Sequence, residues 1–299
     1  MGGKTMEYVL SCCSTADITA EHFKERNISY ICFHFNVDGK DYPDDLGISY
    51  PFKDFYAAMA KGAMTKTSQV SVGEYIEYFE PFLKEGKDII HLTLSSGISG
   101  TLNSATIARD QLREKYSERK IYVVDSLAAS AGYGLLMNKL ADLRDGGMSI
   151  DDLYEWVVEN RLRCQHWFFV SDLTYLVRGG RVSKAAGIIG GALKICPLLN
   201  VDYQGKLIVR AKHRGINAVM KAQVAKMEEL AENGKDYDGD CYISNSDCYD
   251  EARAVADMIE ERFPKLKGKV KITSIGTTIG SHTGPGTVAL FFWGAKRID

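Results

Sequence analysis

The stretch Leu94–Ser104, with the sequence LSSGISGTLNS, decides the fold class of this chain. It is preceded by Asp88–Leu94, a run of apolar and β-branched residues that predicts a buried strand. It continues into Thr101–Tyr116, where apolar residues recur at helical spacing and neither Pro nor Gly interrupts, so a helix is predicted. Strand, short turn and helix in succession indicate a layered α/β unit.

The turn between this strand and helix contains three serines and two glycines. Glycine lets the backbone approach a ligand closely, so that consecutive N–H groups can converge. The helix start favours an anion, and hydroxyl groups donate further hydrogen bonds to a charged oxygen. The turn therefore has the chemistry to hold a carboxylate or a phosphate. The same residues also suit a simple helix cap, and the turn alone does not decide between the two.

Strand and helix alternate through about residue 165, which predicts an α/β layer with a mostly parallel sheet. Ligands of such sheets bind at the carboxyl ends of the strands. Serine-bearing turns follow three predicted strands, after Cys13, Leu94 and Val124, and we expect them to lie at one edge. Residues 65–69 are predicted to be a polar connector rich in hydroxyls.

The second half of the chain does not continue this regular alternation of strand and helix, and it is predicted to be α+β. At 299 residues, two domains are the default, and we place them at residues 1–165 and 166–299. A hairpin is predicted from Pro197–Val201 and Lys206–Arg210, which flank a turn. The uncharged stretch 185–193 predicts either a buried helix or one wall of an apolar slot.

Composition excludes several classes of function. Thirty-seven basic and 39 acidic residues give a net charge of −2, which argues against a nucleic-acid partner. Neither a transmembrane run nor a signal core is present, although transient membrane contact stays open. The seven cysteines have neither zinc-ligand nor disulfide-framework spacing, so we expect reduced thiols, no metal site and a cytoplasmic location.

Nucleotide motifs are missing, because no Gly-Lys pair has the P-loop context and GxGxxG does not occur. A hydrolase is a weak alternative. Gly97–Gly100 is one residue short of the nucleophile elbow, yet Ser99, Asp125 and His282 follow the chain order of an α/β-hydrolase triad. A lipid or ester hydrolase using Ser99 or Ser96 with His282 is therefore kept. His282 stands in GSHTGPG, residues 280–286, which we predict to be an exposed glycine loop whose imidazole donates to the same anion as the serines.

Six short pieces occur in a fixed order along almost the whole chain, and together they resemble the DegV family of bacterial fatty-acid-binding proteins, which includes the binding subunit of fatty acid kinase. As they stand in this sequence, the pieces are STAD at 14–17, TSQ at 67–69, LSSGISGT at 94–101 with Asn103 and Ser104, VDS at 124–126 with Ala129 and Ser130, RGGRV at 178–182 and GSHTGPG at 280–286.

The resemblance implies a two-domain fold with a long-chain fatty acid buried between the domains, and the segment near 63–75 packing with the second domain. It implies that the hydroxyls of Thr67 and Ser96 hold the carboxylate, with further ligand-binding positions at Ser68, Ser95, Gly97, Ser126 and His282. The acyl chain would run into an apolar tunnel. The family's binding subunit does no chemistry alone and needs no cofactor. A partner fatty acid kinase phosphorylates the bound carboxylate.

Two departures from the family pattern affect these expectations. The usual Asp before Ser14 is Cys13, and the usual Pro after Thr-Ser-Gln is Val70. Four arginines are a hypothetical kinase-docking surface: Arg178, Arg181, Arg210 and Arg214. A binding protein for another amphipathic carboxylate is a third hypothesis.

Overall fold

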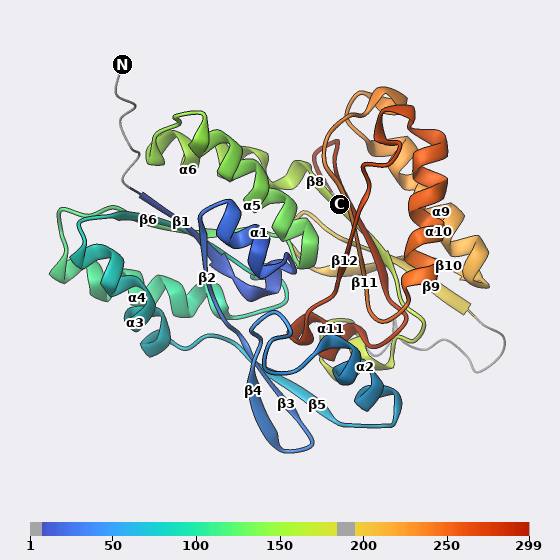
Figure 1. Cartoon of the computed structure of the whole chain (residues 1–299), viewed down its shortest axis with the longest axis horizontal. Coiled ribbons are helices and arrows are strands. Elements are labelled where there is room, and N and C mark those ends of the chain that lie inside the picture. The colour runs from blue at the N-terminus through green and yellow to red at the C-terminus, as the bar shows by residue number, and fades with distance from the viewer. Residues whose placement is uncertain (1–7, 184–194, 299) are drawn as a thin grey trace.

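The computed structural model describes residues 8–183 and 195–298, which form two larger sheets and one small one (Figure 1). The uncharged stretch 185–193 lies outside the described residues. The division into two domains at residue 165 stays a prediction, although the first large sheet uses strands before this point and the second uses strands from Cys164 onward.

The first large sheet is parallel, with the strand order β2-β1-β6-β7. Its strands are almost continuously apolar because helices cover both faces. The predicted α/β layer is thereby confirmed, including the strand and helix on either side of the Leu94–Ser104 stretch. The bounds of the elements in this part are β1 (Tyr8–Cys13), α1 (Ala20–Glu25), β2 (Ile28–Ile31), α3 (Val72–Lys84), β6 (Asp88–Thr93), α4 (Thr101–Lys115), β7 (Ile121–Asp125), α5 (Ser130–Asp145) and α6 (Ile150–Asn160).

The second large sheet has the order β10-β9-β8-β13-β11-β12 and is antiparallel except for the pair β11 and β12. The predicted hairpin is present as β9 and β10. Helix α5 contacts strands of both large sheets and is buried along most of its length, so it is a central element of the main core. The bounds in this part are β8 (Cys164–Phe169), β9 (Ile195–Val201), β10 (Leu207–Arg214), α9 (Ile216–Leu230), β11 (Cys241–Asn245), α10 (Tyr249–Arg262), β12 (Lys271–Ser274) and β13 (Val288–Trp293).

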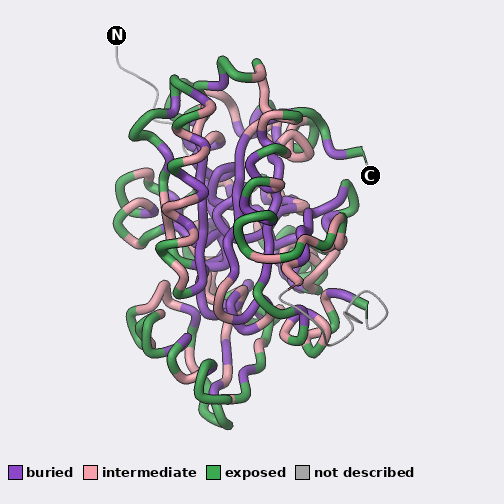
Figure 2. Tube along the Cα trace, turned by 90° about the vertical axis from the view of Figure 1, so that its right-hand side faces the viewer, coloured by how far each residue is buried: buried purple, intermediate pink, exposed green. Residues whose placement is uncertain are grey.

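The small sheet, β4-β3-β5, packs with α2 around its own aromatic core of Phe35, Phe55 and Tyr56. Figure 2 shows the strands of the large sheets buried for most of their length and much of the outer trace exposed. The remaining bounds are β3 (His34–Val37), β4 (Lys40–Pro43), α2 (Phe52–Ala60), β5 (Thr65–Ser68), α7 (Thr174–Arg178) and α11 (Thr277–Thr283). Short 3-10 helices lie at Ser14–Ala16, Arg161–Arg163, Gly234–Asp236 and Pro264–Leu266.

Two sequence predictions about local structure are wrong. Residues 65–68 are not a connector but strand β5, whose hydroxyl-rich residues pair with β3 at the edge of the small sheet. His282 does not stand in an exposed loop but in the last turn of α11, and it is partly buried. Gly, Ser and Thr are weak helix formers, so tertiary contacts must stabilise this helix. One of these contacts passes close to Gly280, where an added Cβ would lie 2.3 Å from Tyr56 Oη.

Among the described helices, none is long and apolar enough to cross a membrane.

Candidate ligand-binding site

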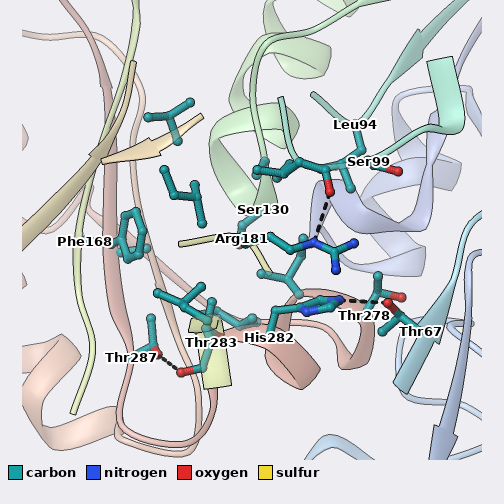
Figure 3. Close-up of a pocket in the computed structure, with 18 of the residues that line it drawn as sticks. Thr67, Leu94, Ser99, Ser130, Phe168, Arg181, Thr278, His282, Thr283 and Thr287 are labelled. Atoms are coloured by element: carbon teal, nitrogen blue, oxygen red, sulfur yellow. Dashed lines mark hydrogen bonds between the residues drawn. The ribbon is translucent and has the colours of Figure 1, made fainter. Parts of the chain in front are cut away.

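A cavity of about 370 Å³ lies where α11, β5, the turn after β6 and the strands β8 and β13 come together (Figure 3). Figure 3 shows Thr67, Arg181, Thr278 and His282 toward one side and Phe168 toward the other. Most of the wall is apolar, from side chains on the second large sheet, on α7 and α11, and on segments that follow the strands of the first large sheet. These side chains are Phe33, Leu94, Ile98, Ala129, Phe168, Leu176, Val201, Leu207, Ile275, Ile279, Ala289 and Phe291.

Thr67 and His282 meet at the polar end, with 2.8 Å between Thr67 Oγ1 and His282 Nε2. Burial, and to a lesser extent the charge of Arg181, lower the pKa of His282 to about 4. The imidazole is therefore neutral at neutral pH. Its other nitrogen packs on the backbone of Gly179, where an added Cβ would lie 2.2 Å from Nδ1. Because of this close approach, no side chain fits at Gly179, the first glycine of the RGGR motif, unless His282 moves.

Arg181 also lines the cavity, which differs from its predicted place on a docking surface. Its Nε donates to the carbonyl oxygen of Ile98 at 3.1 Å, and Nη1 donates to the carbonyl oxygen of Gly179. Burial lowers the pKa of its guanidinium. Within the part of the chain that the structure describes, no carboxylate forms an ion pair with it. A partly buried cation therefore stands in the wall of a mainly apolar cavity.

The other three arginines of the predicted docking surface are exposed. The guanidinium of Arg178 lies 5.4 Å from the ring centroid of Tyr175, while Arg210 and Arg214 lie on β10. The Nε of Arg210 donates to Asn200 Oδ1 at 2.8 Å. Their exposure suits a docking surface, and docking itself stays a prediction.

The Ser/Gly turn does not form the anion cradle that its sequence suggests. Ser95 is buried, and its hydroxyl donates to the carbonyl oxygen of Gly205 at 2.8 Å and accepts from the amide of Gly97 at 3.1 Å. The amide of Ser96 donates to Asp125 Oδ1, and that of Ser99 to the carbonyl oxygen of Ser95. These amides are satisfied within the protein, so they are not available for an anion in this conformation.

Gly97 has a packing role in the same turn. An added Cβ would lie 2.4 Å from the carbonyl oxygen of Gly205, at the tip of the β9–β10 hairpin. Only a glycine permits this contact between the turn after β6 and the hairpin. The N-cap residue of α4, Gly100, has no side-chain cap, so the capping alternative does not describe this turn either. The turn instead joins segments more than 100 residues apart.

The remaining predicted ligand-binding residues fall into two groups. Ser68 lines the cavity with Thr67 and His282. Ser96 is exposed and is not on the cavity wall, and neither is Ser126, whose buried hydroxyl donates to the carbonyl oxygen of Ala128 at 3.3 Å. A ligand contact by Ser95, Ser96, Gly97 or Ser126 stays a prediction.

Cys13 and Val70 are both buried in the main core. Cys13 Sγ lies 3.4 Å from Tyr75 Oη and 3.7 Å from His91 Nε2, and burial raises the pKa of the thiol to about 11. A neutral thiol therefore occupies the position where the family usually has a carboxylate.

The hydrolase alternative receives no support from the geometry. His282 Nε2 bonds to Thr67, and among the described residues no hydrogen bond joins the imidazole to Ser96 or Ser99. Asp125 Oδ1 accepts instead from the backbone amides of Ser96 and Leu127. In the same described ranges, no group of three or more His, Cys, Asp or Glu side chains could hold a metal ion.

Seven further polar side chains line the cavity that sequence reasoning did not place in the ligand site: Gln69, Ser99, Ser130, His166, Thr278, Thr283 and Thr287. Gln69 and Ser130 belong to the six sequence pieces that resemble the DegV family, so the resemblance could have predicted them as site residues. Thr278 lies one helical turn before His282, and this relation becomes visible only once α11 is known to be a helix.

The family model "Uncharacterised protein, DegV family" matches residues 13–294. This chain belongs to the DegV family. A DegV domain-containing protein of Clostridium perfringens is 38% identical over 97% of this chain and 99% of its own length. Two solved structures of proteins from Thermotoga maritima are each 26% identical in sequence to this chain. The first, a DegV lipid-binding protein, superposes with a TM-score of 0.83 and covers 98% of this chain and 100% of its own. The second, a protein described as revealing fatty acid binding function, superposes with a TM-score of 0.79 and covers 97% of this chain and 100% of its own.

Proposed function

We propose that this DegV protein binds a long-chain fatty acid in the cavity described above. The carboxylate lies at the polar end, with Arg181, Thr67 and His282, and the acyl chain lies along the apolar wall. The observation that carries the proposal is Arg181, a cation in the wall of an apolar cavity with no carboxylate partner among the described residues. An amphipathic carboxylate supplies both the missing charge and the apolar surface.

The energetics support this choice of ligand. About 15 methylenes, at about 0.8 kcal/mol each, give a gross gain near 12 kcal/mol before the costs of ordering. A buried carboxylate must be paired or hydrogen-bonded, and guanidinium is the side chain best suited to it. The Thr67–His282 pair adds one donor beside the guanidinium, because the hydrogen bond between the two side chains uses one of their two protons.

The residues off the cavity wall enter the proposal through the family resemblance. Ser96 is exposed and off the cavity wall, so its proposed contact with the carboxylate rests on the family resemblance alone. Ser68 would act with Thr67, while Ser95, Gly97 and Ser126 would hold the surrounding turns in place.

We further propose that the protein has no catalytic role of its own and presents its fatty acid to a partner fatty acid kinase in the cytoplasm. The exposed Arg178, Arg210 and Arg214 are the proposed docking residues. The fatty acid is the ligand and no cofactor is proposed. Another amphipathic carboxylate is the competing ligand class.

The test begins with the purified protein. An organic extract, analysed by mass spectrometry, should contain close to one long-chain fatty acid per chain, and delipidated protein should take up the same acids on incubation. A clean extract without uptake would refute fatty acid binding. Acyl phosphate should then form only when ATP and the kinase are both added. Turnover of a model ester by the protein alone, lost in His282→Ala, would support the hydrolase instead.

A further inference from the structure

Two buried carboxyl groups meet at the start of α11, the helix that carries His282. Asp17 follows β1 and is 6% exposed, and Asp44 follows β4 and is 1% exposed. They approach the same point, because a Cβ added to Gly276 would lie 2.6 Å from Asp17 Oδ1 and 3.6 Å from Asp44 Oδ1. Neither residue lines the cavity.

Asp44 holds the first turn of α11. Its Oδ1 accepts from the hydroxyl of Thr277 at 2.8 Å, and its Oδ2 accepts from the backbone amide of Thr278 at 3.3 Å. The residue at the N-cap, Gly276, has no side chain to do this. A carboxylate more than 200 residues away in the sequence therefore takes the place of the local cap.

Asp17 lies between the start of α11 and the start of α5. Its Oδ2 accepts from the hydroxyl of Ser130 at 2.5 Å, and Ser130 lines the cavity at the start of α5. Its Oδ1 is buried beside the backbone amide of Gly276, which lies close enough to lower the pKa of the carboxyl but forms no hydrogen bond of good geometry. Asp44 thus has a well-formed donor on each oxygen, whereas Asp17 has one well-formed donor and one weaker contact.

Among the described residues, the side chains whose charges act on the pair and its neighbours are acidic. The β4–α2 segment contributes Asp45 and Tyr56, and Cys32 follows β2. The turn before α10 contributes Asp247 and Cys248, which also act on Tyr56. Neither Asp17 nor Asp44 forms an ion pair with a described residue, and burial raises the pKa of both carboxyls. Two adjacent unpaired negative charges are too costly in such a place.

We propose that Asp17 and Asp44 are positioning residues of the ligand site, and that they hold α11 in place as a pair that shares one proton and carries one negative charge. The proton resides on Asp17, which has fewer donors to stabilise an ionised form. Loss of this proton places two charges at the start of α11 and loosens the helix. The proposal rests on the proposed function, because His282 on α11 is part of the fatty acid site.

The test measures how fast a bound fatty acid leaves the protein. Wild-type protein loaded with cis-parinaric acid is mixed with excess lipid vesicles at several pH values from about 6 to about 9. We expect the release rate to rise with pH by about fivefold or more, the usual lower bound for coupling between two sites. Asp17→Asn, which keeps the shape and cannot ionise, should remove this rise.

Two further variants complete the series. Asp44→Asn replaces an acceptor with a donor and should release the probe quickly at every pH, and Thr277→Val should act in the same direction if Asp44→Asn does not fold. Asp41→Asn is the matched control, because the same change is made on strand β4, close to Asp44 in the sequence, at an exposed residue that bonds to Asn36 instead of α11. It should follow the wild-type profile.

A release rate of wild-type protein that is flat with pH, or a rise that persists in Asp17→Asn, overturns the proposal. If wild-type protein binds no cis-parinaric acid, the proposed function has failed, and the pair is then tested by urea unfolding alone. Wild-type stability should fall as pH rises, since the pKa of Asp17 is raised in the folded state, and Asp17→Asn should lose this slope. Equal slopes would refute the shared proton.

Discussion

Replacement of Arg181 by Gln is the most direct test of the site. The guanidinium is the cation that we assign to the ligand carboxylate, and Gln keeps a polar side chain without the charge. A hydrogen bond to a charged group contributes about 1.5–3 kcal/mol. Because Arg181 is only partly buried, we expect a loss of about 2 kcal/mol, which corresponds to a Kd for hexadecanoic acid about 30-fold higher.

The assay compares two ligands that share the same chain. The Kd of delipidated protein is measured by calorimetry or fluorescence competition for hexadecanoic acid and for hexadecanol, which has no carboxylate. Wild-type protein should prefer the acid, and Arg181→Gln should lose most of this preference while its affinity for the alcohol changes little. The difference between the two ligands isolates the contact between charges from any general damage to the cavity.

Arg178→Gln is the matched control for this experiment. It removes the same charge from the same motif, but at an exposed side chain that packs on Tyr175. It should bind both ligands as the wild type does. If Arg181→Gln keeps the full preference for the acid, or if Arg178→Gln loses as much of it, the assignment of the carboxylate to Arg181 is refuted.

Three further predictions follow from the described contacts. Gly179→Ala places a methyl group 2.2 Å from His282 Nδ1, so fatty acid affinity should fall about tenfold, as measured by Kd, with a lower Tm from a strain of about 1–3 kcal/mol. Thr67→Val removes the 2.8 Å bond to His282 and a donor to the ligand, and it should raise the Kd about fivefold while the fold is retained by circular dichroism. Burial lowers the pKa of His91 to about 3, so the imidazole stays neutral in the folded protein and is protonated in the unfolded chain below about pH 6.5. Stability should therefore fall by about 4 kcal/mol between about pH 6.5 and about pH 3 from this residue, and urea unfolding of His91→Gln should show a shallower dependence.

The strand–turn–helix pattern around Leu94–Ser104 could be predicted from the sequence because its causes are local. The run of apolar and β-branched residues before the turn and the helical spacing after it depend on neighbours within a few positions. The capping box that opens α3, between Ser71 and Glu74, was predictable for the same reason. The family resemblance drew attention to Thr67, Ser68 and His282, and all three line the cavity.

Other features depended on partners far away in the sequence. Residues 277–283 have poor helix propensity, and they form α11 because Asp44 caps their first turn and Gly280 admits Tyr56. The sequence predicts Arg181 to be a surface residue, since the RGGR motif gives no sign that its first glycine packs on His282 or that Arg181 lines the cavity.

The sequence by itself determined the α/β layer, the recognised motifs and the side chains available for an anion. Only the tertiary structure decided which of those side chains face the ligand. The hydroxyl of Ser95 donates to the carbonyl oxygen of Gly205, 110 residues later, whereas the guanidinium of Arg181 donates only to backbone carbonyls and has no carboxylate partner among the described residues. The physical reason is that a polar group binds a ligand only if the fold does not satisfy it first, and this accounting depends on contacts that no local pattern records.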